Sequence, residues 1–433
     1  MLDPAGSTTS LALPGPKPPM PSNLLEHKLD TEDKPWMRGS DRRQKISWWL
    51  TLCGILLGAL GAAAVCYLGY TSVYVLPAQY TCKLLLDEDF SGSTLNTDTW
   101  HYDVELGGFN DGEFEITTDN DTNVFIKNNQ LYIKPTLTSD VLSGGYSALF
   151  DGGSYDLGSS CSTSNTTACS VTADNSTGTV VNPVMSGRLT TRGLVSMQYG
   201  RIEVRAKLPR GDWLWPSIWM LPENDADEDE NWSGDYGDWP LSGEIDIMSS
   251  RGNGVNYKGR GCNYVQGALT YGVMDSLIET LYGWWSLKQS TYADDFHTYA
   301  IEWDPDFMRF YTDTRLDDIL TVVTKTEKQS FWTRGSFPEV TQNGSSEVVV
   351  VNPWKNDGYN APFNKPFYLI IDLAVGGTNG WFPDNEGGKP WYDGSSSAMY
   401  DFAKAQDTWY ANWPTDEDDL SFRIDSVKMW TTC

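Results

Sequence analysis

The sequence predicts one large all-β domain, an antiparallel β-sandwich over about residues 83–433, preceded by a single transmembrane helix. Apolar and polar residues alternate with a period of two through most of the chain after Cys82, which is typical of strands. Helical stretches are few there, and no charged residue occurs from Ile46 to Cys82. A β-propeller is the main alternative on pattern alone, but the absence of an internal repeat disfavours it.

The uncharged segment predicts a membrane span with a defined orientation. Residues 46–76 form the expected helix and its flank, and the part from Trp48 to Leu68 is apolar and long enough to cross a bilayer. A buried core helix and a cleaved signal peptide are the alternatives; the late start and the length disfavour the signal peptide. Basic residues stand just before the segment, so we expect a cytoplasmic N-terminus and an extracellular or lumenal C-terminal domain, in the plasma membrane or a secretory-pathway membrane.

Composition separates a tail from the domain. Residues 1–45 are poor in large apolar side chains and rich in proline, which predicts a disordered cytoplasmic tail. The rest of the chain has 24 basic and 52 acidic residues, a net charge of −28. Such a surface repels nucleic acid and suits an uncharged substrate, although solubility outside the cell explains it equally well.

Five cysteines follow the membrane segment, in a compartment that permits disulfides. Cys161 and Cys169 flank a short loop and are expected to pair. Cys82 and Cys433 mark the two ends of the domain and could pair if the terminal strands are neighbours, which leaves Cys262 over. Five Asn-X-Ser/Thr sites fit a glycosylated lumenal domain: Asn120, Asn165, Asn175, Asn231 and Asn343.

Several strands and two surface loops can be placed from the pattern. Residues 201–208 alternate charged and apolar side chains, and residues 367–375 form an apolar run expected to be covered on both faces. Hairpins are predicted around Asn128-Asn129 and around residues 304–306. Residues 139–182, rich in Ser, Thr and Gly, and the acidic residues 223–238 are interpreted as long surface loops.

The motif with the clearest chemistry is GEIDIMSSR at residues 243–251. On a strand, Glu244 and Asp246 share one face, and Ile245 points to the core. A β-bulge near residues 247–248 would turn Ser249 onto the acidic face. Retaining cleavage of a glycosidic bond needs two carboxyl groups, one as nucleophile and one as acid/base. Alone, the motif is weak, because a solvated strand face would look the same.

Taken with its surroundings, the motif resembles the signature of glycoside hydrolase family 16, in its laminarinase and β-1,3-glucan-recognition branch. The matching segments are GDWLWPSIWMLP at 211–222, SGRLTT at 186–191, YGRIEVRAK at 199–207, FHTYAIEW at 296–303 and AVGGTNG at 374–380. They cover about residues 84–430 in order. The resemblance implies a concanavalin A-like jelly-roll β-sandwich with a sugar cleft on its concave face, and similar membrane-anchored members occur in fungi.

The resemblance places Glu244 on the nucleophile and Asp246 on the assisting carboxylate. Ser249 falls on the acid/base glutamate and departs from it, and a hydroxyl cannot supply this proton efficiently. Loss of general-acid help typically costs ~10²–10⁴-fold in rate. Glucan-recognition members of the family have lost catalytic carboxylates and bind without cutting. An engineered inactivating mutation would leave the same trace in the sequence.

Further residues are candidates for contact with substrate. Trp213, Trp215 and Trp239 are expected to line the cleft and stack on sugar rings, with core packing as the alternative. Trp219, within an apolar stretch, is expected in the core. Arg188 is interpreted as a polar group of the cleft or a surface charge. The chain has three histidines and no Cys/His cluster, so we expect no cofactor and no catalytic transition metal; a structural calcium ion stays open.

The sequence therefore predicts a single-pass type II membrane protein whose family-16 domain engages β-1,3-glucan or a related cell-wall polysaccharide. The favoured function is binding, or catalysis impaired at Ser249. The first alternative is a working hydrolase or transglycosylase that uses a substitute acid, for which the acidic residues 223–230 are candidates. The second is a structural membrane protein, which the retained Glu244 and Asp246 disfavour.

Overall fold

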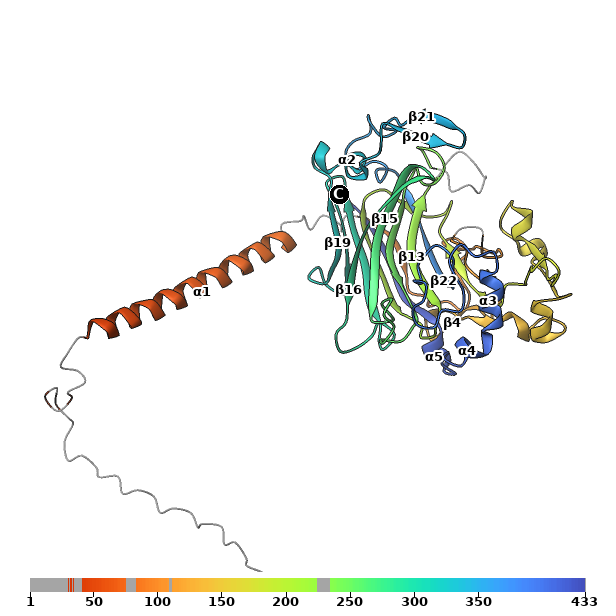
Figure 1. Ribbon diagram of the computed structural model, residues 1–433, viewed down its shortest axis with the longest axis horizontal. Coiled ribbons are helices and arrows are strands. Elements are labelled where there is room, and N and C mark those ends of the chain that lie inside the picture. Colours follow the sequence, from red (N-terminus) through yellow and green to blue (C-terminus); the bar gives the residue numbers. More distant parts are fainter. Residues whose placement is uncertain are drawn as a thin grey trace, which may run out of the picture. The chain divides into compact units, whose positions relative to one another are not determined.

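The computed structural model describes residues 30, 32, 34, 41–74, 83–108, 111–223 and 234–432 (Figure 1). It divides into two compact units, Met1–Val75 and Leu76–Cys433. Most of the predicted tail, the acidic residues 224–233, Asn231, Cys82 and Cys433 lie outside the described residues. The expectations for those residues therefore stay predictions.

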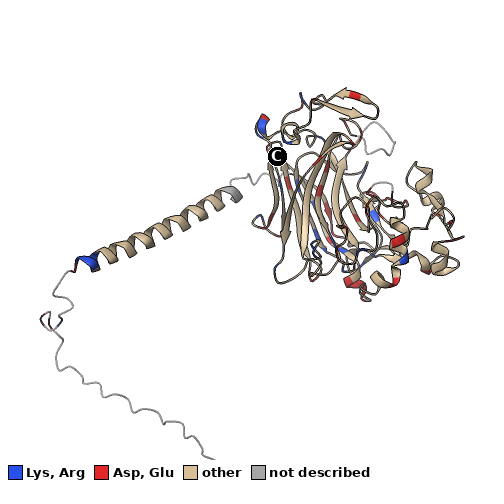
Figure 2. Cartoon of the chain, in the orientation of Figure 1, with Lys and Arg blue, Asp and Glu red and all other residues tan. Residues whose placement is uncertain are grey.

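The first unit contains one long helix, α1, Arg42–Tyr74. Its 33 residues extend about 50 Å at 1.5 Å per residue, which exceeds the ~30 Å of a bilayer's hydrocarbon core. All of its charged residues lie in the first turn, and the rest is uncharged (Figure 2). By length and composition, Arg42–Thr71 could cross a membrane. The helix begins four residues before the predicted segment 46–76.

The second unit is a sandwich of two antiparallel sheets, which confirms the predicted fold class. Sheet A has the strand order β19-β18-β17-β12-β23-β5-β4, with β1 also paired to β23. Its strands are β19 Asp318–Val323, β18 Phe307–Thr312, β17 His297–Asp304, β12 Gly200–Lys207, β23 Phe422–Thr431, β5 Gln130–Ile133, β4 Val124–Lys127 and β1 Lys83–Glu88. The predicted alternation is seen in β12, where Ile202, Val204 and Ala206 are fully buried.

Sheet B carries the motif and has the strand order β16-β15-β14-β13-β22-β10-β2, with β11 paired to β22. Its strands are β16 Leu277–Ser286, β15 Tyr264–Met274, β14 Glu244–Ser250, β13 Leu214–Pro222, β22 Phe367–Val375, β10 Arg188–Thr190, β2 His101–Tyr102 and β11 Ser196–Met197. Every residue of the central strand β22 is buried, as its apolar run predicts. The main core lies between the sheets and includes Ile245 and Ile247 of β14.

The predicted hairpins are confirmed. β4 and β5 are joined by Asn128 and Asn129, both with positive φ (55° and 58°). Two successive left-handed residues match the right-handed twist of the flanking strands, and asparagine tolerates this conformation better than most residues. β17 and β18 pair across residues 304–307.

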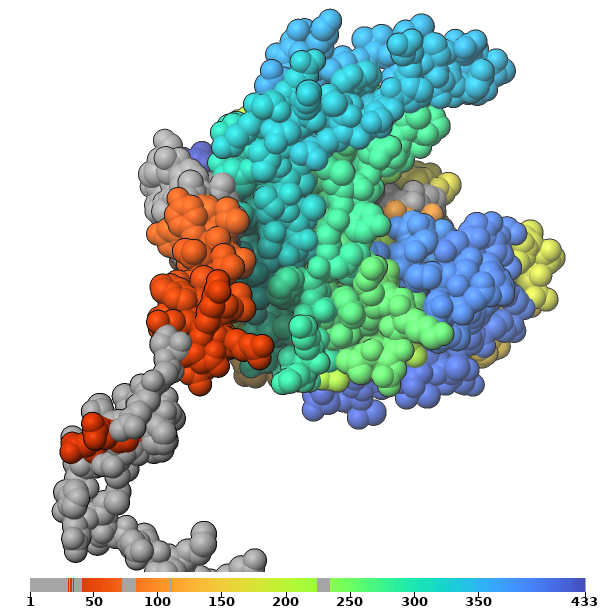
Figure 3. All heavy atoms as spheres, turned by 60° about the vertical axis from the view of Figure 1, so that its left-hand side comes forward, coloured from red at the N-terminus to blue at the C-terminus, as the bar shows by residue number. Residues whose placement is uncertain are grey.

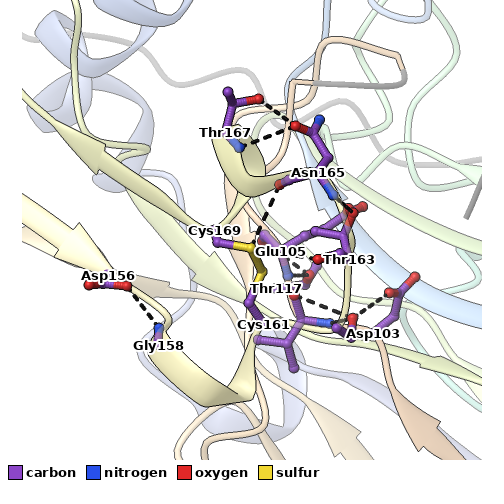
Figure 4. Close-up of a disulfide and its surroundings, with 12 residues drawn as sticks. Asp103, Glu105, Thr117, Asp156, Gly158, Cys161, Thr163, Asn165, Thr167 and Cys169 are labelled. Carbon is purple, nitrogen blue, oxygen red and sulfur yellow. Dashed lines mark hydrogen bonds between the residues drawn. A yellow bond between two sulfur atoms is a disulfide. The ribbon is translucent and has the colours of Figure 1, made fainter.

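Residues 139–182 were predicted to be a surface loop; most of the segment is turns and irregular chain, but it is folded more than that prediction implied. The segment, called the insertion below, contains the hairpin β7 Ser154–Asp156 with β8 Ser170–Thr172 and several 3₁₀ turns. It has its own apolar cluster, in which Leu149, Ala168 and Val181 are fully buried. Apolar residues scattered among Ser, Thr and Gly are enough to form this cluster, because it also packs against Ala403 of a C-terminal helix. The predicted disulfide Cys161–Cys169 lies within the insertion (Figure 4).

Short elements complete the domain. Three strands form a small sheet, β3 Glu115–Thr117, β9 Val184–Ser186 and β6 Thr136–Leu137. The helix α2 Phe331–Gly335 and the hairpin of β20 Val340–Asn343 with β21 Ser346–Val349 cover one end of the sandwich, in cyan in Figure 3. The helices α3 Ala398–Lys404, α4 Gln406–Tyr410 and α5 Glu417–Leu420 precede the last strand.

Candidate functional site

A cleft of about 520 Å³ lies on the face of sheet B that points away from sheet A. The central strands of the sheet supply its floor. Its lining residues are Asp111, Glu113, Arg188, Trp215, Ser217, Trp219, Trp239, Glu244, Asp246, Ser249, Gln266, Ala268, Thr270, Ile278, Thr280, Asp372, Ala374, Asn379 and Trp381. The lining combines carboxyl groups, hydroxyl and amide groups, and indole rings.

A bulge in β14 places Ser249 in this cleft. Ile218 of β13 pairs with Met248 and Trp219 with Asp246, so Ile247 is an extra residue without a partner on β13. The ladder to β15 shifts between Asp246 and Ser249 as well. With strict alternation Met248 would face the cleft, but it is completely buried in the core. The extra residue turns Ser249 to the face that carries Glu244 and Asp246, as the sequence predicted.

Glu244 and Asp246 form a coupled acidic pair. A hydrogen bond joins the two side chains, and the indole N–H of Trp239 donates to Oε2 of Glu244 at 3.0 Å. Burial, followed by the neighbouring charge of Asp246, raises the pKa of Glu244 well above its ordinary value. Burial and the charge of Asp111 raise the pKa of Asp246 to about 7. The pair therefore holds a proton near neutral pH, which the indole donor helps to orient.

Ser249 has a neutral environment. It is 6% exposed, and its Oγ lies 3.1 Å from the Oγ of Ser217 on the neighbouring strand β13. Gln266 is its register partner on β15. None of these three side chains titrates in the physiological range. At this position of the cleft the described chain therefore offers hydroxyl and amide hydrogen bonds and no general acid.

Asp111 is a second titratable group of the cleft, and the sequence analysis did not identify it. It lies on the connection between β2 and β3, with its main-chain oxygen accepting from Thr378 N at 2.9 Å. Desolvation by the surrounding protein, followed by the charge of Glu113, raises the pKa of Asp111 to about 6, even though the residue as a whole is exposed. A hydrogen bond from Asn379 partly offsets this rise.

Arg188 forms the centre of a buried ionic network in the cleft. It is 4% exposed, and its guanidinium lies 3.0 Å from Glu105, 3.6 Å from Glu113 and 3.6 Å from Asp372. Asp372 in turn accepts a hydrogen bond of 3.0 Å from the indole N–H of Trp219. The guanidinium interacts with several carboxylates at once, and the network fixes the ring of Trp219. Arg188 is therefore a buried group of the cleft and not a surface charge.

The predicted positions of Trp213 and Trp219 are both wrong: Trp213 is in the core, and Trp219 lines the cleft. Trp213 is 2% exposed and packs edge-on against Tyr257, Phe382 and Trp391, away from the cleft. Its φ of 70° interrupts the alternation just before β13 begins, so it does not share a face with Trp215. Trp219, expected in the core, follows Trp215 and Ser217 at a spacing of two and lines the cleft.

The other indole rings build one wall of the cleft. Trp215 stacks on Trp381 with a centroid distance of 5.1 Å, and Trp381 stacks on Trp284 at 5.7 Å. The guanidinium of Arg251 lies 4.0 Å from the Trp381 ring and donates to its main-chain oxygen. Cation–π contact and hydrogen bonding thus hold Trp381 rigidly against the cleft.

Signals for the missed residues exist in the sequence. Asp372 is the single charged residue within the apolar run 367–375, and a carboxylate on a buried strand requires a partner. Trp381 directly follows the AVGGTNG segment. Asp111 has no such local signal, because only the fold brings its loop to sheet B.

Among the described residues, no group of three or more His, Cys, Asp or Glu side chains is arranged to hold a metal ion. The structural calcium ion that the sequence analysis left open stays a prediction without a test.

Comparison with known proteins shows to which family the chain is related. A profile described as "Glycosyl hydrolases family 16" matches residues 157–361. The "Beta-1,3-glucan-binding protein" of Penaeus monodon is 38% identical over 347 residues, covering 78% of this chain and 87% of that protein. The "Glucan endo-1,3-beta-glucosidase A1" of Niallia circulans is 29% identical over 321 residues, covering 70% of this chain but 35% of that protein.

Among solved structures, the laminarinase from Rhodothermus marinus aligns with a TM-score of 0.47 and 21% identity, over 81% of this chain and 98% of that one. The extent and identity of the match to the Penaeus monodon protein establish the relationship. The chain belongs to glycosyl hydrolase family 16. Its relatives include proteins named for glucan binding and proteins named for glucan hydrolysis.

Proposed function

We propose that this protein binds β-1,3-linked glucan in the cleft on sheet B and cleaves it little or not at all. The observation that carries the proposal is Ser249, a neutral side chain on the cleft face beside the retained pair Glu244 and Asp246. A retaining glycosidase needs one carboxyl group as nucleophile and one as acid/base; in the family motif Glu244 takes the nucleophile position and Ser249 the acid/base position. The relatives named for glucan binding support the same ligand.

The cleft suits a neutral sugar chain. Trp219 and Trp381 line the cleft with indole rings, a type of side chain on which pyranose rings stack, and Gln266, Thr270 and Thr280 offer groups that hydrogen-bond sugar hydroxyls. The carboxyl pair shares a proton, so it can both donate and accept such bonds. The guanidinium of Arg188 offsets part of the negative charge of its carboxylate neighbours at the floor of the cleft.

Asp111 favours a second candidate function, a slow hydrolase or transglycosylase with a substitute acid. Its pKa of about 6 would leave a fraction of the carboxyl groups protonated at neutral pH. The predicted substitutes in the acidic loop lie outside the described residues apart from Glu223, which accepts hydrogen bonds from Gly193 N and does not line the cleft. Under this alternative, Asp111→Asn would abolish turnover.

We infer in addition that α1 anchors the domain to a membrane as a type II protein, with the domain outside or in a lumen. The basic residues at the start of α1 support this orientation. N-glycosylation stays a prediction; Asn120, Asn165, Asn175 and Asn343 are all exposed. Membership of a fungal-type, membrane-anchored subgroup also stays a prediction.

The experiment that tests the proposal combines binding with product analysis. The detergent-solubilised full chain should bind laminarin-type glucan in preference to cellulose and chitin, and should release no oligosaccharide over hours. Binding without preference would contradict the assigned ligand. Release of oligosaccharide at a rate that Asp111→Asn abolishes would establish the second candidate instead.

A further inference from the structure

A second groove of about 460 Å³ lies outside the cleft, between the insertion and the start of helix α3. One side is formed by β8 and the turn that follows it, and the other by residues 396–400. The insertion packs on this helix through its apolar cluster, and the hydroxyl of Tyr146 donates to the main-chain oxygen of Ala403 at 3.3 Å. The groove is therefore a seam between two packed elements.

The lining of the seam is neutral and rich in hydroxyl groups. None of the described residues that line it is charged, although the chain after residue 45 carries a net charge of −28. Ser170, Thr172 and Ser396 are exposed, and their hydroxyls point to no assigned partner among the described residues. The ring of Tyr400 is half-buried and is held edge-on by Phe150 at 5.3 Å. Free hydroxyls beside a fixed aromatic ring suit an uncharged, polyhydroxylated ligand.

The wall formed by β8 is held in place before any ligand binds. The disulfide Cys161–Cys169 closes the loop directly before Ser170, and Asn165 within that loop accepts hydrogen bonds from the N–H and hydroxyl of Thr167 (Figure 4). The pairing of β7 with β8 also restrains the wall, from Ser170 as far as Thr172. A rigid wall lowers the entropy that binding would cost.

One segment of chain connects the seam to the cleft. Leu106 and Gly107 line the seam, and Asp111 and Glu113 of the same segment line the cleft. Asn182, also in the seam, donates to the main-chain oxygens of Gly107 and Glu115 and so clamps this segment. Glu113 is six positions after Gly107 along the chain, a span of at most ~22 Å when fully extended. The two sites are thus close enough for one polysaccharide molecule.

We propose that the seam between the insertion and α3 is a second glucan-binding site, so that a long glucan engages the cleft and the seam together. The inference rests on the proposed function, because it assigns the same class of ligand to a separate surface. Once the cleft holds one part of a chain, the other part is at high effective concentration at the seam. Long glucan should therefore bind more tightly than an oligosaccharide that fills the cleft alone.

The test measures the affinity of the full chain for laminaritetraose and for a long β-1,3-glucan. Thr172→Arg and Ser396→Arg each introduce a bulky charge at an exposed position of the seam, and Ser346→Arg makes the same change on the hairpin β20–β21, outside both sites. We expect both seam variants to lose at least tenfold in affinity for long glucan and to keep their affinity for laminaritetraose. The Ser346→Arg variant should match the unmodified chain for both ligands.

The outcomes separate the two proposals. Unchanged affinity of the seam variants for long glucan, with folding verified by circular dichroism, would overturn the second site and leave the cleft function standing. Failure of the unmodified chain to bind either ligand would reject the proposed function itself. A cleft variant, Trp219→Ala, should retain weak binding to long glucan through the seam while losing laminaritetraose.

Discussion

The chemistry proposed for the cleft depends on the side chain at position 249. Ser249 lies in the cleft because a bulge turns it there, and its hydroxyl lies 3.1 Å from that of Ser217. Glu244 and its partner Asp246 keep the environment of a reactive carboxyl pair, with a raised pKa and an indole donor. Under the proposed function, the cleft keeps the carboxyl pair of a retaining glycosidase and lacks the proton donor at position 249.

Ser249→Glu should restore hydrolysis of β-1,3-glucan by ~10²–10⁴-fold, the usual contribution of a general acid. Ser249→Gln is the matched control, because it has the same size and cannot release a proton. The measurement is product release from laminarin-type glucan, followed by chromatography. Equal rates in both variants would mean that position 249 is not the site of proton donation.

Truncation of Trp219 should affect glucan binding, whereas truncation of Trp213 should affect stability. Trp219→Ala removes a ring from the cleft and should weaken glucan binding by about 1–2 kcal/mol, with the fold intact. Trp213→Ala removes a ring from the core and should lower the free energy of unfolding by about 3–5 kcal/mol. Calorimetric titration and thermal unfolding of both variants separate the two effects. Weaker binding of Trp213→Ala at a temperature where it is fully folded would contradict this assignment.

At the scale of elements, the insertion is a folded unit with two sources of stability. Its apolar cluster is continuous with the C-terminal helices, and the disulfide closes a short loop within it. The chain-entropy account of a nine-residue loop gives ~2.5 kcal/mol for the disulfide. Because the sandwich has a separate core, this contribution should act locally.

Replacing Cys161 and Cys169 by serine should therefore accelerate amide hydrogen exchange in residues 154–182 while leaving exchange in β13 and β14 unchanged. The midpoint of thermal unfolding of the sandwich should move by no more than a few degrees. Hydrogen exchange with mass spectrometry reports both regions in one experiment. A uniform increase in exchange across the domain would show that the insertion and the sandwich unfold together.

The whole molecule combines strong acidity with buried carboxyl groups. Burial raises the pKa of Asp246 to about 7 and that of Asp372 to about 6, above the ~4 of an unfolded chain. Between these values the folded state binds more protons than the unfolded state, so the free energy of unfolding falls as pH rises from about 4 to 7. Lower pH also relieves repulsion among the surplus acidic residues.

The domain should accordingly unfold at a higher temperature at pH 5 than at pH 8. Asp246→Asn should reduce this difference, because the amide does not titrate, whereas Asp407→Asn on the surface should leave it nearly unchanged. Thermal unfolding at both pH values measures the effect. An identical pH dependence in the Asp246→Asn variant would show that surface charge alone sets it.

The helix α1 is long and apolar enough to cross a membrane, and the proposed attachment of the whole molecule can be tested. Alkaline extraction of membranes should leave the full chain in the pellet and release a chain that begins at Lys83. A tag at the N-terminus should be protected from protease in sealed cells, and a tag at Cys433 should be accessible from outside or from the lumen. The reverse pattern of protection would contradict the orientation inferred from the basic residues before the helix.

The sequence by itself determined the features that depend on local pattern. The period of two in residues 201–208, the Asn128-Asn129 turn and the apolar run 367–375 each specify their strand or hairpin without help from distant residues. The same is true of the face shared by Glu244 and Asp246 and of the short disulfide loop. The family resemblance added the jelly-roll architecture and the place of the cleft on one face of it.

Only the tertiary structure decided which side chains complete the site. Trp213 and Trp219 belong to the same Trp-rich segment, and their faces were decided by the left-handed backbone at Trp213 and the register of β13. Asp111 reaches the cleft because its loop, more than 130 residues from β14 along the chain, is bonded to Thr378. The insertion folds because its sparse apolar residues meet α3. Contacts between segments so distant in sequence leave no periodic signal, because neither segment alone specifies its partner.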